Sequence, residues 1–113
     1  MATLTVTELD RDGKIINDLD QAAAPGGDEF ANTGREVFYF SNADGSSKTV
    51  TFVTQTTVDS LAVADKAVTV DAGDSVLVGP FPTSTYNDSN SRVQVTYSAV
   101  TSCLVAAFKI PPA

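Results

Sequence analysis

The sequence contains no histidine and no tryptophan, and cysteine and methionine occur once each. Without histidine there is no Ser-His-Asp triad, no Cys-His dyad and no histidine-ligated metal site. The single cysteine, Cys103, has no partner for an intrachain disulfide. No other group of residues has the spacing of a catalytic motif. The sequence therefore predicts a protein that is not an enzyme and that uses no cofactor, metal or small-molecule substrate.

Basic residues are also few. Seven Lys and Arg stand against 14 Asp and Glu, which gives a net charge of −7 at pH 7 and a pI of about 4.2. Because phosphate backbones are bound by clustered Lys and Arg, nucleic acid is not expected as a partner. The sequence has no run of about 18 apolar residues and no secretory signal at its start, so we expect no membrane association and assembly in the cytoplasm.

β-branched residues dominate what is present. Valine, threonine and isoleucine make up 31 of the 113 residues, and apolar residues alternate with polar ones along most of the chain. Both features are typical of strands. We predict strands over residues 2–9, 35–42, 48–54, 66–70, 75–78, 92–98 and 102–110, with 56–64 ambiguous between strand and loop.

Seven or eight short strands separated by turn residues favour an all-β fold. The predicted architecture is an antiparallel β-sandwich or jelly-roll-like domain. Residues 83–90 are polar and are expected to hold at most one helical turn. The side chains predicted for the core are Phe38, Phe40, Phe52, Val95 and Phe108.

Residues 17–34 have no clean period and contain a Pro-Gly-Gly breaker, so we interpret them as a long ordered loop. The chain is therefore divided into residues 1–34, an N-terminal strand with an irregular acidic arm, and residues 35–113, the β-core of the same structural domain. The first 30 residues hold seven acids and only two bases. These acids are the predicted partner-binding residues: Glu8, Asp10, Asp12, Asp18, Asp20, Asp28 and Glu29.

Two groups among these acids allow other interpretations. Asp10, Asp12 and Gly13 have a spacing found in calcium-binding loops, but the closing acid and the flanking helices of an EF-hand are missing, so a solvated turn is favoured. The four acids between residues 18 and 29 could act as a general acid and base, but they lie on a Gly/Pro-rich loop without a shaped pocket. A hydrated loop, or a patch that meets a basic partner, is the preferred interpretation.

Three further features favour structural roles. Cys103 lies in a predicted strand and has no activating base, so we expect a small core hydrophobe. Gly26-Gly27 and Gly73 lack the Lys-Ser/Thr of a phosphate loop and are explained by turns. Gly79-Pro80-Phe81-Pro82, together with Tyr86, is either an aromatic binding loop or an internal cap, and the cap is favoured.

Over residues 1–110 the sequence is similar to a family of small tailed-bacteriophage virion proteins encoded beside the major capsid gene. The similarity lies in the order and spacing of short motifs, each weak alone. They are Gly26-Gly27-Asp28-Glu29-Phe30-Ala31-Asn32-Thr33-Gly34-Arg35, Thr69-Val70-Asp71-Ala72-Gly73, Gly79-Pro80-Phe81-Pro82, Tyr86-Asn87-Asp88 and Val93-Gln94-Val95-Thr96-Tyr97-Ser98.

This resemblance implies a capsid decoration (cement) protein on the virion surface, which binds the major capsid protein as a homotrimer and clamps neighbouring capsomers. The resemblance implies no catalytic residue. The alternatives are a tail-tube, head–tail connector or fibre-associated protein. A surface carbohydrate-binding module is a further alternative, weakened by the absence of tryptophan.

Overall fold

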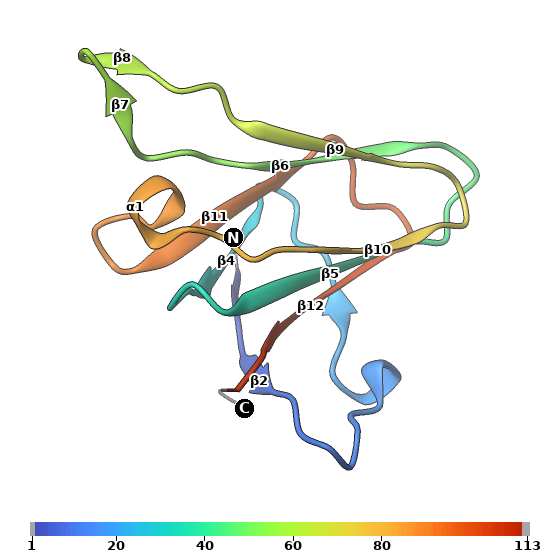
Figure 1. Ribbon diagram of the computed structural model, residues 1–113. Helices are drawn as coiled ribbons and strands as arrows, with labels where there is room; N and C mark the ends of the chain where they lie inside the picture. Colours follow the sequence, from blue (N-terminus) through green and yellow to red (C-terminus); the bar gives the residue numbers. More distant parts are fainter. Residues whose placement is uncertain (1, 112–113) are drawn as a thin grey trace.

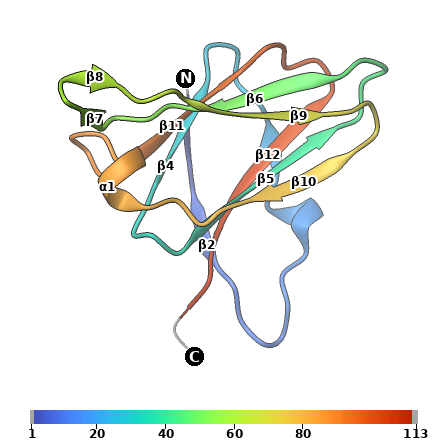
Figure 2. The ribbon, with the colours of Figure 1, turned by 45° about the horizontal axis from the view of Figure 1, so that its top comes forward.

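The structure is a computed structural model that describes residues 2–111. It contains twelve strands, one 3-10 turn and one single-turn helix (Figures 1 and 2). The elements are β1 (Ala2–Leu4), β2 (Val6–Glu8), η1 (Ile16–Asp18), β3 (Gln21–Ala22), β4 (Asp28–Ala31), β5 (Glu36–Asn42), β6 (Lys48–Phe52), β7 (Thr57–Val58), β8 (Leu61–Ala62), β9 (Lys66–Val70), β10 (Ser75–Val78), α1 (Thr83–Tyr86), β11 (Arg92–Tyr97) and β12 (Cys103–Lys109). The prediction of a mostly β protein is confirmed, and so is the single helical turn.

The strands form two five-stranded sheets and one separate hairpin. The first sheet has the order β1-β4-β11-β6-β9, and the second has the order β10-β5-β12-β2, with β3 also paired to β12. β7 and β8 pair only with each other. All pairings are antiparallel except β1 with β4 and β12 with β2, which are parallel. The sheets are therefore mixed, and the expectation of purely antiparallel pairing is wrong at these two N-terminal strands.

The N-terminal segment departs most from the prediction. The single strand expected over residues 2–9 breaks at Thr5, so that β1 joins the first sheet and β2 joins the second. This crossing lets Leu4 turn inward, where it is 4% exposed. The break, together with β3, β4 and the separate hairpin, explains why there are twelve strands rather than seven or eight.

The prediction of an irregular arm over residues 17–34 is wrong at the C-terminal end of this range. Asp28–Ala31 is β4, which lies between β1 and β11 in the first sheet. Its alternation is hidden in the sequence because one of its two inward side chains is a carboxylate, Asp28, while the other is Phe30. The segment between β2 and β4 holds only η1 and the two-residue β3.

The two large sheets share one core. Phe38 of β5 contacts Phe52 of β6 edge to face, with ring centroids 5.4 Å apart, and stacks on Phe30 of β4 at 5.8 Å. Phe40 stacks on Tyr97 of β11 at 5.6 Å. Because each pair joins one sheet to the other, these rings hold the sheets together. The prediction that Phe38, Phe40, Phe52 and Val95 are buried is confirmed.

Phe108 is buried as predicted, at 4% exposure, but not in this core. Successive residues of β12 alternate between the two faces of the second sheet, and Val105 and Ala107 point inward. Phe108 therefore points outward, where it lies beside Leu9 and Ile16 of the segment that follows β2. The N-terminal segment thus supplies a second, smaller apolar contact on the outer face of this sheet.

Candidate functional site

The structure places the seven predicted partner-binding acids in two separate regions. Glu8, Asp10, Asp12 and Asp18 are exposed and Asp20 is half-buried, and all five lie on the stretch from β2 to the start of β3. This stretch forms the projecting loop below β2 in Figure 1. The other two acids, Asp28 and Glu29, belong to β4 in the first sheet. The acids are therefore not brought together into one binding surface.

The loop after β2 is an exposed turn whose residues bond to one another. Asp10 accepts a hydrogen bond from the Asp12 amide at 3.0 Å and forms an ion pair with Lys14 at 3.1 Å. The hydrogen bond from Lys14 is the main reason why the pKa of Asp10 is lowered. Within residues 2–111, no group of three or more Asp, Glu or Cys side chains is placed to hold a metal ion.

Asp28 is completely buried, so the prediction that it contacts a partner is wrong. Its Oδ2 accepts hydrogen bonds from the Tyr97 hydroxyl at 2.7 Å and from the Ala24 amide at 3.2 Å. Its Oδ1 has no hydrogen-bond partner in the described part of the chain. The Tyr97 hydroxyl and the Ala24 amide replace water as hydrogen-bond donors to this carboxylate. Asp28 thereby links β4 to β11 and to the loop that precedes β4.

Glu29 points to the opposite face of β4 and is bound by its neighbours. Its Oε2 accepts hydrogen bonds from Arg92 Nη1 at 2.6 Å and from Thr3 Oγ1 at 3.0 Å, and its Oε1 accepts one from Gln94 Nε2 at 3.0 Å. The hydrogen bonds from Gln94 and Thr3 are the largest causes of a lowered pKa at Glu29. The negative charge of Glu29 is therefore already paired with residues of the first sheet.

These positions also bear on the acid–base interpretation. Adjacent residues of a strand point to opposite faces, so the carboxyl groups of Asp28 and Glu29 do not share a pocket. Asp18 and Asp20 lie in the other region. The four carboxylates thus lack the convergent geometry that paired acid–base catalysis needs.

Burial, followed by the hydrogen bond to the Asp28 carboxylate, raises the pKa of the Tyr97 phenol far above its ordinary value. Since the raised value belongs to the folded state, its contribution to stability is complete below the unfolded pKa of about 10 and is lost as the pH rises above it. We expect Tyr97→Phe to lower the free energy of unfolding at neutral pH by about 1–3 kcal/mol, because Asp28 loses a donor. The variant should also lose less stability than the parent protein above about pH 10.

Denaturant unfolding between neutral pH and pH 11 measures both effects. Tyr39→Phe is the matched control, because Tyr39 lies on the outer face of the second sheet and has no contact with Asp28. Equal losses in the two variants would contradict the role assigned to the Tyr97 hydroxyl.

The Gly79–Pro82 loop is an internal cap, as favoured from the sequence. Phe81 is 3% exposed and contacts Phe30, Phe52 and Tyr86 with ring centroids 4.9–5.6 Å apart. The amide of the buried Asn32 donates to the Phe81 carbonyl at 2.9 Å and to Asn87 Oδ1 at 2.7 Å. These contacts fix the loop over the edge of the core and leave Phe81 unavailable to a ligand.

Cys103 is a core side chain, as expected. It is 2% exposed, and burial is the main reason why the pKa of its thiol is raised. A raised pKa keeps the sulfur protonated and unreactive.

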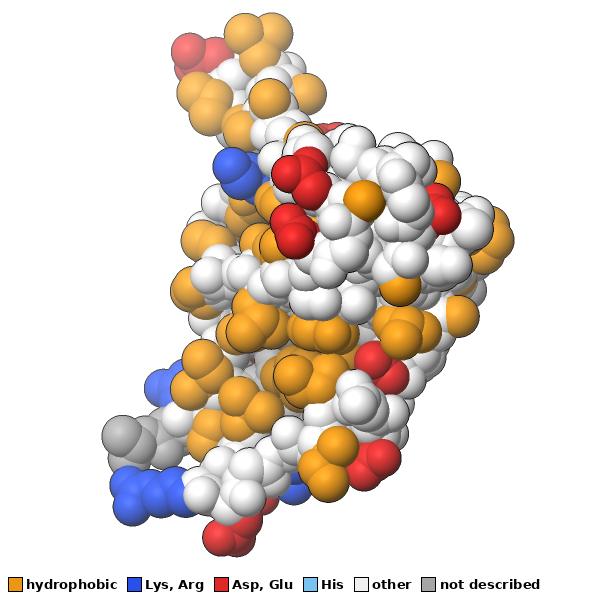
Figure 3. Space-filling view, turned by 90° about the vertical axis from the view of Figure 1, so that its right-hand side faces the viewer, with side chains coloured by type: hydrophobic (Ala, Val, Ile, Leu, Met, Phe, Trp, Pro, Cys, Tyr) orange, Lys and Arg blue, Asp and Glu red, His pale blue; other side chains and the backbone are white. Residues whose placement is uncertain are grey.

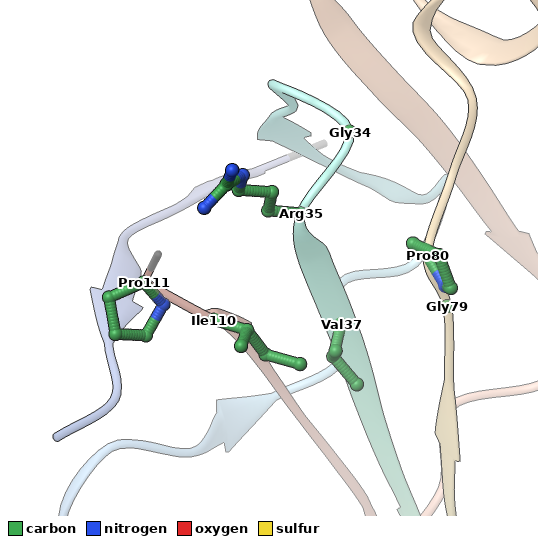
Figure 4. Close-up of a pocket in the computed structure, with 7 residues that line it drawn as sticks. All are labelled: Gly34, Arg35, Val37, Gly79, Pro80, Ile110 and Pro111. Atoms are coloured by element: carbon green, nitrogen blue, oxygen red, sulfur yellow. The ribbon is translucent and has the colours of Figure 1, made fainter. Parts of the chain in front are cut away.

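The structure reveals an apolar groove that the sequence analysis missed. Two adjoining hollows of about 440 and 240 Å³ lie on the outer face of the second sheet. Val37 and Ile110 line both of them, and the first is flanked by Arg35 and Pro111 on one side and by Gly79 and Pro80 on the other (Figure 4). The signal in the sequence was the alternating run Leu104, Ala106, Phe108 and Ile110, which marks a shared face but not its direction.

The hydrophobic surface extends beyond the groove. Leu77 and Ile110, which line the groove, are 64% and 52% exposed, and Ile15, outside the lining, is 67% exposed. Hydrophobic side chains gather over the middle and lower part of the face seen in Figure 3, and acidic side chains lie around them. All nine aromatic residues fall within the described chain, and each is buried or half-buried, which disfavours a stacking platform for sugars.

Comparison with protein-family models, curated proteins and solved structures finds no match to this chain. Within the described residues, no helix has the length and apolar character needed to cross a membrane. The candidate sites are thus the acidic loop after β2 and the apolar groove of the second sheet.

Proposed function

We propose that the chain is a structural protein of a tailed-bacteriophage virion that decorates the outer surface of the capsid. In this proposal the two sheets form a β-sandwich, and homotrimers bind the major capsid protein across neighbouring capsomers. Decoration stabilises the shell by mass action, because a protein that binds only the assembled, expanded shell favours that state in proportion to its occupancy.

One observation supports the proposal above the others. Four of the five motifs on which the family resemblance depends meet in space, although the bonded residues are far apart in the sequence. Asn32 bonds to the Phe81 carbonyl and to Asn87, and Asp28 bonds to Tyr97, across separations of 49, 55 and 69 residues. These motifs therefore belong to one internal framework, which is what a resemblance in overall fold requires of them.

The acidic loop after β2 is the docking element we propose for the capsid. Glu8, Asp12 and Asp18 are exposed, and none of them has an ion-pair partner among residues 2–111. Lys and Arg on a shell of other protein complement these charges. Because charges at the rim of an interface govern the rate of encounter more than the final affinity, their main effect is expected in the association rate.

The test uses heads of the encoding phage that lack this protein. The labelled protein should co-sediment with expanded heads and not with unexpanded ones. Its association should slow as salt rises from 0.1 to about 1 M, where the Debye length falls from about 10 to about 3 Å. Binding to neither form, or equal binding to both, would contradict the proposed function.

A charge reversal tests the docking element itself. Asp12→Lys combined with Asp18→Lys should slow association several-fold at low salt, because two attractive charges become repulsive. Asp71→Lys combined with Asp74→Lys is the matched control, since these acids lie on the exposed turn between β9 and β10. Equal rates for the two double variants would remove the acidic loop from the docking surface.

A further inference from the structure

The hairpin of β7 and β8 is the least supported element of the fold. Its two strands pair only with each other, and the hairpin projects from the body of the molecule (Figures 1 and 2). Val58 and Leu61 are directly opposite each other in the register and therefore share one face. They are 63% and 70% exposed. Since an isolated two-stranded hairpin is only marginally stable in water, an apolar face on it indicates a surface that another molecule covers.

The turn of this hairpin carries a charged residue at a position whose backbone conformation favours glycine. Asp59 and Ser60 both have positive φ, 52° and 63°, as a two-residue type I′ turn requires. Glycine is favoured at such positions because it adopts them without strain. The chain instead presents the Asp59 carboxylate at the tip, beside the apolar pair.

The groove on the second sheet has the complementary character. Its lining is apolar at Val37, Leu77 and Ile110, and it carries two basic side chains, Lys14 and Arg35. Lys14 is paired with Asp10, whereas Arg35 is exposed and has no ion pair within residues 2–111. A narrow apolar segment with one acid at its tip suits this hollow in both shape and charge.

We propose that the groove binds the β7–β8 hairpin of a second copy of this chain. Val58 and Leu61 then cover Leu77 and Ile110, and Asp59 pairs with Arg35. The hairpin of the same chain does not fill the groove, because none of residues 57–62 lines either hollow. The contact is head to tail, so that repeating it either closes a ring or extends a chain of copies. This inference goes beyond the proposed function, because it requires no capsid.

Cross-linking between two differently labelled batches tests the contact directly. One batch carries Val58→Cys and the other Leu77→Cys, both at exposed positions, while the native Cys103 is buried and unreactive. Oxidation of the mixture should give disulfide-linked dimers that contain one chain of each kind. Thr69→Cys on the exposed surface of β9 is the control partner for Val58→Cys and should not cross-link.

Dimers formed by Val58→Cys alone would show contact between two hairpins, and dimers formed by Leu77→Cys alone would show contact between two grooves. Either result would overturn the proposal. So would a purified protein that sediments as a monomer at every concentration from micromolar to millimolar.

A charge exchange tests the pairing of Asp59 with Arg35. Asp59→Lys and Arg35→Glu should each weaken self-association about tenfold or more in sedimentation experiments, as expected when one side of a central charged contact is reversed. The double variant, which restores opposite charges, should recover most of the loss. Asp74→Lys is the control for a change of net charge. Failure of the double variant to recover would overturn the assigned contact.

Discussion

Replacing Phe40 with alanine is expected to lower the free energy of unfolding by about 3–5 kcal/mol. Phe40 has no exposed surface, lies in an interior strand of the second sheet and stacks on Tyr97 of the first. Its removal takes away apolar burial and leaves a cavity between the two sheets. For a domain of this size the loss is a large part of the total stability.

Chemical denaturation monitored by circular dichroism measures this change. Thr69→Ala is the control, because Thr69 is exposed on β9, outside the proposed contacts, and its truncation should change the stability by no more than about 0.5 kcal/mol. A loss below about 1 kcal/mol for Phe40→Ala would contradict the position of this ring between the sheets.

The second large effect is expected at Gly27, and the adjacent Gly26 provides a matched control. Both glycines have positive φ, 92° at Gly26 and 104° at Gly27. A Cβ on Gly26 would meet nothing within 4 Å, whereas a Cβ on Gly27 would collide with the carbonyl oxygen of Val95. Val95 belongs to β11, in the interior of the first sheet, so the obstacle is backbone that cannot move aside cheaply.

Gly26→Ala should therefore cost about 1–2 kcal/mol, from the backbone conformation alone. Gly27→Ala should cost that amount and a further 1–3 kcal/mol, roughly, for the displacement of β11. Thermal unfolding of the two variants gives the difference. If both variants lose the same stability, the close approach of Gly27 to β11 is wrong.

The strands that could be predicted are those whose pattern is complete within a few residues. β5, β6, β9, β10, β11 and β12 lie within the predicted ranges, because each alternates clearly and is bounded by turn residues. β4 was missed because Asp28 occupies an inward position. The buried carboxylate is satisfied by the Ala24 amide and by the hydroxyl of the distant Tyr97, and no local pattern reveals the Tyr97 partner.

Phe108 shows a second limit. A period of two tells which residues of a strand share a face, but not which face meets the core. By this period Leu104, Ala106, Phe108 and Ile110 share one face, yet that face is the outer one, where the groove lies. The parallel pairings of β1 with β4 and of β2 with β12 were equally hidden, because both partner strands lie farther along the chain.

The candidate site was predictable only in part. The sequence marks residues 1–30 as acidic and residues 17–34 as poorly periodic, and five of the seven acids lie between β2 and β3 in the structure. Counting charges does not tell whether a carboxylate is solvated or already paired with a basic side chain, as Glu29 is with Arg92. The groove required knowledge of which segments lie side by side, which the topology alone supplies.

The central claim, that this protein decorates the capsid, is tested most directly by cryo-electron microscopy of phage particles with and without it. The account predicts difference density on the outer surface of the expanded head, at positions between neighbouring capsomers, into which the two-sheet body fits with the acidic loop after β2 toward the shell. Difference density confined to the tail or the head–tail connector, or no difference between the two particles, would contradict it.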